Sequence, residues 1–321
     1  MVLPVFPSHI LTTRQFLDRD LIEELFGQAD RYAEADAQGT LPQILKGKIL
    51  ACVFYEPSTR TRFSFEAAMQ KLGGSVIQTE SAGHFSSAMK GETLEDSIRT
   101  IGGYADAIML RHSEVGAAER AARVSSVPII NGGDGSREHP TQSLLDLYTI
   151  HKELGRMDKF HMGLMGDLLY GRTIHSLIYL LSLSNEIEVT LIAPPPLKLP
   201  KEYRDFLTAH RIPFHETDNL PEALPHLDVL YVTRIQKERF TDPLLYQRMQ
   251  HTFILTKTLA ETLPKHAIIL HPLPRVDEIP TEVDADPRAA YFQQARNGLS
   301  IRMALLAKIL ETCPHPSPTP A

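Results

Sequence analysis

A cluster of hydroxyl and guanidinium side chains, Ser58-Thr59-Arg60-Thr61-Arg62, follows an apolar segment and a proline. We expect a helix to begin here, with Ser58 as its N-cap. The backbone N–H groups of a helix N-terminus and the helix dipole attract anions. Because hydroxyl and guanidinium groups add further donors, the cluster predicts a phosphate-binding site. Arg60 is the favoured phosphate ligand, whereas Arg62 could equally form a structural salt bridge.

Further polar side chains follow other predicted strands. Taken alone, Arg172 or Arg234 would more commonly form a surface ion pair, and His139 would equally be a structural histidine. In open α/β sheets, however, ligands bind at the carboxyl ends of the strands, although polar loops also lie there. The arginines of the second half suit carboxylates. The groups that join the first cluster at this edge are Arg111-His112, His139-Pro-Thr-Gln142, Arg172, Arg234 and His271-Pro-Leu-Pro-Arg275.

Several common cofactor motifs do not occur in the chain. The sequence contains no Gly-x-x-x-x-Gly-Lys-Ser/Thr loop, no Gly-x-Gly-x-x-Gly turn, no His-Glu-x-x-His pair and no Cys-x-x-Cys pair. These motifs are the usual signatures of ATP, NAD and zinc sites. We therefore expect no cofactor and no metal.

Short apolar runs alternate with amphipathic segments along the chain. The run at 49–55 is continuously apolar, as a strand buried on both faces requires. The helix after Ser58 has apolar residues at helical spacing and ends at Gly73-Gly74. Further strands are expected at 76–77, 107–110, 128–130, 160–165, 189–192, 229–232 and 267–270. Further helices are expected from Thr93, over 114–124, from Pro140, over 173–183 and over 201–210.

This alternation predicts an α/β fold with parallel sheets and right-handed crossovers. A length of 321 residues suggests two domains. The residues 131–135 are expected to form a loop after a strand, and the long helix from Pro140 is expected to connect the domains. The segment 313–321 contains four prolines and is predicted to be a disordered tail.

The overall composition excludes several functional classes. Hydrophobic residues make up 43% of the chain and charged residues 22%, as in ordinary globular proteins. The formal net charge of −6 gives no attraction to nucleic acid or to an anionic membrane. Cys52 and Cys313 are too few for a disulfide framework, so a reducing cytoplasm fits best. No export signal or membrane-length apolar run is recognisable, and neither nucleic acid nor membrane is expected as a partner.

The motifs together resemble those of the carbamoyltransferases, and more closely those of aspartate carbamoyltransferase catalytic chains. The Ser-Thr-Arg-Thr-Arg motif alone would indicate only the superfamily, which includes the ornithine enzymes. The similar stretches occur in family order over nearly the whole chain: 54–66, 90–94, 132–135, 139–142, 166–167, 171–173, 233–239 and 271–275.

Three features favour aspartate over ornithine as the acceptor. Ornithine enzymes typically carry Cys where this chain has Pro272, and their Ser-Met-Gly motif does not occur here. Arg234 and Gln236 suit a second carboxylate, which ornithine lacks. The alternatives are a carbamoyltransferase for another amino acid such as ornithine, or a non-catalytic anion-binding relative or structural subunit. A pure binder would have no use for His139, Gln142 and Lys90.

The resemblance implies a role for each matching residue. The phosphate of carbamoyl phosphate would be held by Ser58, Thr59, Arg60, Thr61 and Arg111, with Ser86 and Lys90 from a neighbouring subunit. The carbamoyl NH₂ would be bound by Gln142 and the carbonyls of Pro272 and Leu273. The carbonyl oxygen would be polarised by Thr61, Arg111 and His139. The two aspartate carboxylates would be bound by Arg172, Arg234 and Gln236, with Lys90 also contacting aspartate.

The implied architecture has two doubly wound parallel-sheet domains joined by long helices, with the active site in the interdomain cleft. The carbamoyl phosphate-binding domain would comprise residues 1–141 and 298–312, and the aspartate-binding domain residues 142–297. The reaction would yield N-carbamoyl-L-aspartate and phosphate, a step of pyrimidine biosynthesis, in a cytoplasmic homotrimer with shared active sites. Regulatory chains or another enzyme of the pathway as partners remain open.

Overall fold

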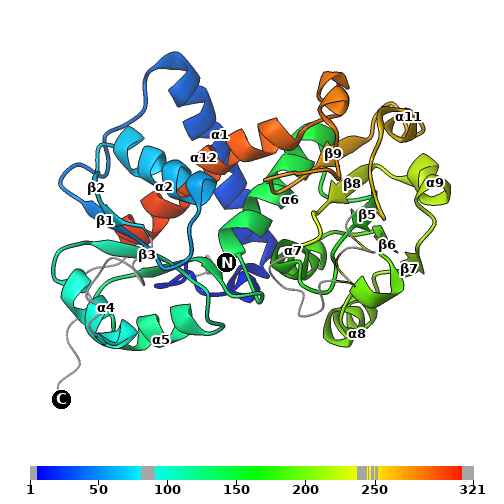
Figure 1. Cartoon of the computed structure of the whole chain (residues 1–321). Coiled ribbons are helices and arrows are strands. Elements are labelled where there is room, and N and C mark those ends of the chain that lie inside the picture. Colours follow the sequence, from blue (N-terminus) through cyan, green and yellow to red (C-terminus); the bar gives the residue numbers. More distant parts are fainter. Residues whose placement is uncertain are drawn as a thin grey trace. The chain divides into compact units, whose positions relative to one another are not determined.

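The computed structural model describes residues 6–80, 91–236, 244, 246, 249 and 252–312. The chain forms two compact units, the first Met1–Thr141 with Asn297–Ala321 and the second Gln142–Arg296. Each unit contains a parallel β-sheet (Figure 1). The prediction of a two-part α/β fold with parallel sheets is confirmed. Ser86, Lys90 and the tail 313–321 lie outside the described residues.

The first unit is built on a four-stranded sheet in the order β2-β1-β3-β4. Almost every residue of β1, β3 and β4 is buried, as the continuous apolar runs predicted. The strand order reverses direction between β1 and β3, which is where ligands bind in sheets of this kind. The strands are β1 (Ile49–Phe54), β2 (Ser75–Thr79), β3 (Ala107–His112) and β4 (Ile129–Asp134).

Helices cover both faces of this sheet (Figure 1). α2 packs on β1 and β2, while α4 and α5 pack on each other and on β3. Thr93 caps α4 by accepting the Asp96 amide at 3.1 Å, as its predicted start requires. The helices and short 3₁₀ segment of this unit are η1 (Thr13–Phe16), α1 (Arg19–Gln38), α2 (Thr59–Lys71), α4 (Leu94–Gly102) and α5 (Ala117–Val124).

The second unit has a five-stranded sheet in the order β7-β6-β5-β8-β9. Its order reverses between β5 and β8, so the loops after these two strands form its expected binding edge. The strands are β5 (His161–Met165), β6 (Glu188–Ile192), β7 (Phe214–Thr217), β8 (Val229–Val232) and β9 (Ile268–Leu270). The helices are α7 (Arg172–Leu181), α8 (Lys201–Ala209), α9 (Leu220–Ala223) and α11 (Lys257–Ala260), with 3₁₀ segments η3 (Pro195–Leu197), η4 (Leu224–His226) and η6 (Thr281–Ala285).

The chain passes between the units within two long helices, α6 (Pro140–Leu154) and α12 (Tyr291–Thr312). Pro140 is the first residue of α6, where its missing N–H costs no hydrogen bond. No described helix is both long and apolar enough to cross a membrane.

Three expectations about local structure were wrong. The segment 131–135 is not all loop, because β4 continues to Asp134 while the Asn131 backbone N–H donates to the Ile10 carbonyl at 2.7 Å. α5 begins at Ala117 rather than at 114, because Gly116 adopts a left-handed conformation with φ 83°. The strand β7 was not foreseen, because an edge strand with partly exposed residues lacks a continuous apolar run.

Candidate active site

The predicted phosphate cluster lies at the N-terminus of α2, directly after β1. Ser58 is the N-cap residue with extended backbone, but its side chain makes no capping hydrogen bond. No acidic residue stands in the first turn of α2. Thr59 and Arg60 are exposed and Ser58 is half-buried. This helix end therefore keeps the positive character that favours an anion.

Arg62 has the structural role that the sequence left open. Its guanidinium pairs with Glu80 at 3.1 Å and with Glu66 at 3.8 Å. It also lies over the ring of Phe63, with 4.9 Å between the guanidinium carbon and the ring centroid. These contacts fix Arg62 to the fold.

Arg111 extends from the end of β3 beside the loop that follows β1. Its position follows from the sheet register, which pairs Arg111 with Phe54. The guanidinium donates to the Glu56 carboxylate at 3.3 Å and to the Gly132 carbonyl at 3.3 Å. The Arg111 side chain is only 11% exposed, so these two acceptors hold its orientation.

Thr61 and His139 lie within hydrogen-bond distance of each other, with 3.4 Å between Thr61 Oγ1 and His139 Nε2. Both residues are buried. The neighbouring Glu138 is also buried and accepts the Thr13 amide at 2.6 Å. Burial raises the pKa of Glu138. The first unit thus brings Thr61 of α2 to His139, which directly precedes α6.

Arg172 and Arg234 follow the neighbouring strands β5 and β8. Arg172 is the first residue of α7, and Arg234 lines a small pocket together with Thr233 and Glu278. The loops after these two strands come very close, since a Cβ on Gly166 would lie 2.2 Å from the Thr233 carbonyl oxygen. Gly166 also has φ +113°, which other residues rarely adopt.

Asp167 connects these two loops and was not singled out from the sequence beyond its place in the Gly-Asp motif. Its carboxylate accepts the Tyr170 amide at 2.9 Å and the Gln236 amide at 3.4 Å. Gln236 Nε2 in turn donates to the Tyr170 carbonyl at 3.1 Å. Burial raises the pKa of Asp167 to about 6, although these hydrogen bonds and the charge of Arg234 oppose the shift. A buried carboxylate thus fixes Gln236 on the loop after β8.

The segment after β9 carries Pro272 and Leu273. The Leu273 amide donates to His271 Nδ1 at 2.7 Å, and His271 Nε2 lies 2.8 Å from the Glu278 carboxylate. Leu273 has φ 53° and a cis peptide bond to Pro274. Both Pro272 and Leu273 are half-buried.

Arg275 ends the same segment but is used structurally. It pairs with Asp284, and it donates to the Tyr291 hydroxyl at 2.9 Å. The hydrogen bond with Asp284 raises the pKa of Arg275 and lowers that of Asp284. We therefore do not include Arg275 among the candidate binding residues.

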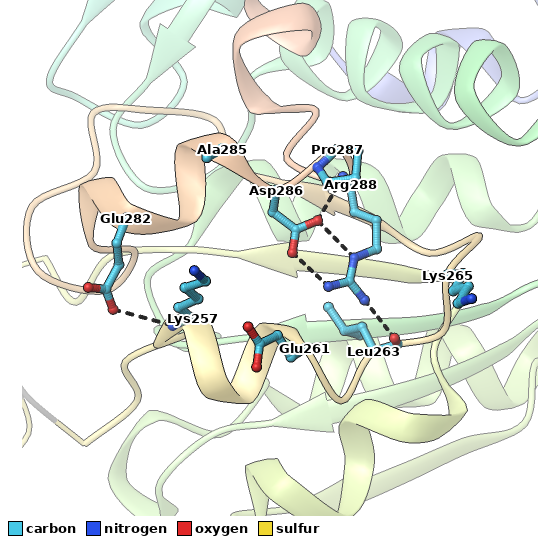
Figure 2. Close-up of a pocket in the computed structure, with 9 residues that line it drawn as sticks. All are labelled: Lys257, Glu261, Leu263, Lys265, Glu282, Ala285, Asp286, Pro287 and Arg288. Atoms are coloured by element: carbon cyan, nitrogen blue, oxygen red, sulfur yellow. Dashed lines mark hydrogen bonds and ion pairs between the residues drawn. The ribbon is translucent and has the colours of Figure 1, made fainter.

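A larger pocket of the second unit, about 570 Å³, contains none of the candidate residues (Figure 2). Three acidic and three basic side chains line it. The Arg288 guanidinium is bound by Asp286 at 2.6 Å and donates to the Leu263 carbonyl at 2.6 Å. Because its charges are balanced within the fold, this pocket is a weaker candidate for anionic substrates.

Metal ligation has no candidate in the described part of the chain, where no group of three or more His, Cys, Asp or Glu side chains could hold an ion. Ser86 and Lys90 stand among the residues outside the description, so their placement at the site stays a prediction.

Comparison with known proteins identifies the family. Two family models match, one described as "Aspartate/ornithine carbamoyltransferase, carbamoyl-P binding domain" over residues 8–152 and one as "Aspartate/ornithine carbamoyltransferase, Asp/Orn binding domain" over residues 158–309. The chain is 49% identical to aspartate carbamoyltransferase 2, chloroplastic, of Pisum sativum, over 94% of this chain and 78% of the relative. It is also 49% identical to the aspartate carbamoyltransferase catalytic subunit of Methanocaldococcus jannaschii, over 95% of this chain and 98% of the relative.

Solved structures agree with the sequence relatives. A structure of the M. jannaschii catalytic subunit matches with a TM-score of 0.88 at 48% identity, covering 95% of this chain and 98% of that one. The Trypanosoma cruzi enzyme in complex with carbamoyl phosphate and aspartate matches with a TM-score of 0.89 at 41% identity, covering 94% of this chain and 96% of that one. The resemblance inferred from the motifs is confirmed: the chain belongs to the aspartate/ornithine carbamoyltransferase family.

Proposed function

We propose that this chain is an aspartate carbamoyltransferase, which transfers the carbamoyl group of carbamoyl phosphate to the amine of L-aspartate. The observation that carries the proposal is the extent of the similarity: relatives of this name are about 49% identical over at least 94% of the chain. The related T. cruzi structure contains both substrates, carbamoyl phosphate and aspartate. The products are N-carbamoyl-L-aspartate and phosphate.

The first unit supplies the proposed phosphate ligands. Ser58, Thr59, Arg60 and Thr61 bind the phosphate at the N-terminus of α2, and Arg111 binds it from the end of β3. This assignment is supported by the side chain of Ser58, which makes no capping bond, and by the acid-free first turn of the helix. The Glu56 contact supports it further, because it holds the Arg111 guanidinium beside the loop that leads into α2.

Stabilisation of the carbonyl oxygen is the proposed task of Thr61, Arg111 and His139. Negative charge develops on this oxygen when the amine attacks, and donors arranged in advance lower the barrier. The 3.4 Å approach of Thr61 and His139 supports their action at one atom. His139 then serves as a donor to the carbonyl oxygen rather than as a base.

Arg172, Arg234 and Gln236 are the proposed aspartate ligands. A dicarboxylate needs two cationic or donor groups in a fixed geometry, and arginine provides planar pairs of N–H donors. The Asp167 bonds across the loops after β5 and β8 support this assignment, because they fix Gln236 relative to Tyr170, which precedes the Gly171-Arg172 start of α7.

The reaction needs few proton transfers from the protein. The neutral amine of aspartate attacks the carbamoyl carbon and forms a C–N bond, giving a tetrahedral intermediate. The C–O bond to phosphate then breaks, and the phosphate leaves with the electron pair. The departing phosphate can accept the proton lost by the amine, so no enzyme nucleophile is required.

The oligomer and the compartment are further parts of the proposal. Ser86 and Lys90 of one chain complete the active site of the next in a homotrimer, as the family resemblance implies. The low cysteine content supports the cytoplasm, although the P. sativum relative is named chloroplastic.

The proposed function is tested with the purified chain by measuring phosphate release from carbamoyl phosphate with aspartate and, separately, with ornithine. We expect release with aspartate that depends on its concentration, together with formation of N-carbamoyl-L-aspartate. Transfer to ornithine alone would support the alternative acceptor. No transfer to any amino acid, in a folded chain that binds carbamoyl phosphate, would support the non-catalytic alternative.

A further inference from the structure

Asp146 is a fully buried carboxylate on α6 that the proposed mechanism does not use. Its Oδ1 accepts hydrogen bonds from Gln142 Nε2 at 2.8 Å and from Gln294 Nε2 at 2.7 Å. Its Oδ2 accepts the Tyr231 hydroxyl at 2.7 Å. All four residues belong to the second unit. A buried carboxylate is tolerated only with such hydrogen-bond partners, and these three donors compensate the buried charge of Asp146.

The Tyr231 hydroxyl stays a donor in this arrangement. Burial and the adjacent Asp146 carboxylate raise the pKa of Tyr231 well above its usual value. Tyr231 lies on β8 and is fully buried. It thus anchors one carboxylate oxygen to the sheet and leaves the other to the two glutamines.

The contact with Asp146 decides which way the Gln142 amide faces. A glutamine amide carries donors on its nitrogen and acceptors on its oxygen. Because the nitrogen is bound to the carboxylate, Gln142 Oε1 is the end left for a ligand. Gln142 therefore acts as an acceptor, which is what the NH₂ of a carbamoyl group requires.

The same carboxylate orients Gln294 in the same way. Gln294 Nε2 binds Asp146, and Gln294 Oε1 accepts the His271 amide at 2.8 Å. His271 directly precedes Pro272 and Leu273, and its ring accepts the Leu273 amide at 2.7 Å. The position of this segment therefore depends on Asp146 through one intervening side chain.

We propose that Asp146 is a positioning residue that lets the enzyme recognise the NH₂ group of its donor substrate. The inference rests on the proposed function together with the roles that the family resemblance implies, in which Gln142 and the Pro272 and Leu273 carbonyls accept from the carbamoyl nitrogen. One buried carboxylate holds both of these acceptor groups. An acyl phosphate with a methyl group in place of NH₂ leaves the acceptors unpaired, so it is disfavoured.

Acetyl phosphate provides the test, because it differs from carbamoyl phosphate only in having CH₃ in place of NH₂. We would measure kcat/KM for carbamoyl phosphate and the inhibition constant of acetyl phosphate against it, which needs no turnover of acetyl phosphate. For Asp146→Ala we expect kcat/KM to fall by about tenfold or more, the effect of losing one well-placed hydrogen bond. The acetyl phosphate inhibition constant should change by less than about twofold, because no acceptor contacts the methyl group.

Tyr231→Phe is the matched control. It removes one hydrogen bond to the same carboxylate but leaves both glutamine contacts at Oδ1. We expect Tyr231→Phe to have a lower unfolding temperature. Its preference for carbamoyl phosphate over acetyl phosphate, taken from kcat/KM and the inhibition constant, should be unchanged. If Asp146→Ala is not recovered folded, Asp146→Leu, which is similar in shape but cannot accept a hydrogen bond from either glutamine, gives the deciding comparison.

Equal losses for both acyl phosphates in a folded Asp146 variant, or no loss for either, would overturn the inference. If the preference between the two acyl phosphates changed as much in Tyr231→Phe as in Asp146→Ala, the inference would also be overturned. The effect would then result from the loss of stability and not from the glutamine contacts. Failure of the proposed function has a different signature, because the unmodified chain would then transfer no carbamoyl group to aspartate.

Discussion

Asp167 makes the stability of this protein depend on pH in a defined window. Its carboxyl group is fully buried, and burial raises its pKa from 3.8 to about 6. Such a shift corresponds to about 3 kcal/mol between the two protonation states. A carboxyl whose pKa is raised on folding adds stability that is fully present below the unfolded value. That stability is lost as the pH rises through the folded value.

Replacing Asp167 by Asn removes this titration while retaining a side chain of similar shape. The free energy of unfolding of the unmodified chain should therefore fall by about 2 kcal/mol more than that of Asp167→Asn between pH 4 and pH 7, because part of the full effect is already lost at pH 4, just above the unfolded pKa. Other buried carboxyls, such as Asp134 and Glu138, titrate in both proteins and cancel in the difference.

Urea unfolding of both proteins at half-unit pH intervals measures this difference directly. The aspartate KM provides a second readout, because the amide nitrogen introduced by Asp167→Asn would oppose one of the two backbone donors, from Tyr170 or Gln236. We expect KM to rise in the variant at pH 8. Parallel stability curves from pH 4 to pH 7 would refute the buried-carboxylate account of Asp167.

Three further substitutions test the proposed ligands. Arg60→Ala should lose most of kcat/KM, because truncating one partner of a desolvated charge pair costs about 2 to 5 kcal/mol. Arg99→Ala is the control: Arg99 forms an exposed ion pair with Asp96 at 3.0 Å, so this variant should keep its kcat/KM. Arg234→Ala should raise the aspartate KM steeply and leave carbamoyl phosphate affinity nearly unchanged; equal losses for both substrates would make Arg234 structural. If each site is shared within a trimer, reassembling Arg60→Ala with Lys90→Gln chains in equal amounts should restore about a quarter of the sites. Native mass spectrometry would verify that hybrid trimers form. Activity equal to the sum of the two parent proteins in such hybrids would contradict sharing.

Much of the fold could be predicted because buried parallel strands are continuously apolar. The runs at β1, β3, β5, β6 and β8 were recognised for that reason. β7 was missed because its edge position leaves its residues partly exposed. The extension of β4 to Asp134 was missed because Asn131 and two glycines are typical of loops, and the pairing with Ile10 is distant in sequence.

The candidate ligands could be named from residue type and position, but their supporting contacts could not. Hydroxyls and arginines after strand ends indicate anion binding without knowledge of the tertiary structure. The bond from Gln294 to Asp146 joins residues 148 positions apart, and no local pattern predicts it. A signal was nevertheless present, because Asp146 is a charged residue four positions after Gln142, among apolar residues of a buried helix.

The choice of acceptor is the central claim, and competition in one solution tests it most directly. The purified chain would receive ¹³C-labelled carbamoyl phosphate with equal concentrations of L-aspartate and L-ornithine, and NMR would follow both carbamoylated products. The account predicts that N-carbamoyl-L-aspartate accumulates with equimolar phosphate, in at least about hundredfold excess over the ornithine product, because Arg234 would have no carboxylate partner in the ornithine side chain. Comparable amounts of the two products, or an excess of the ornithine product, would contradict it.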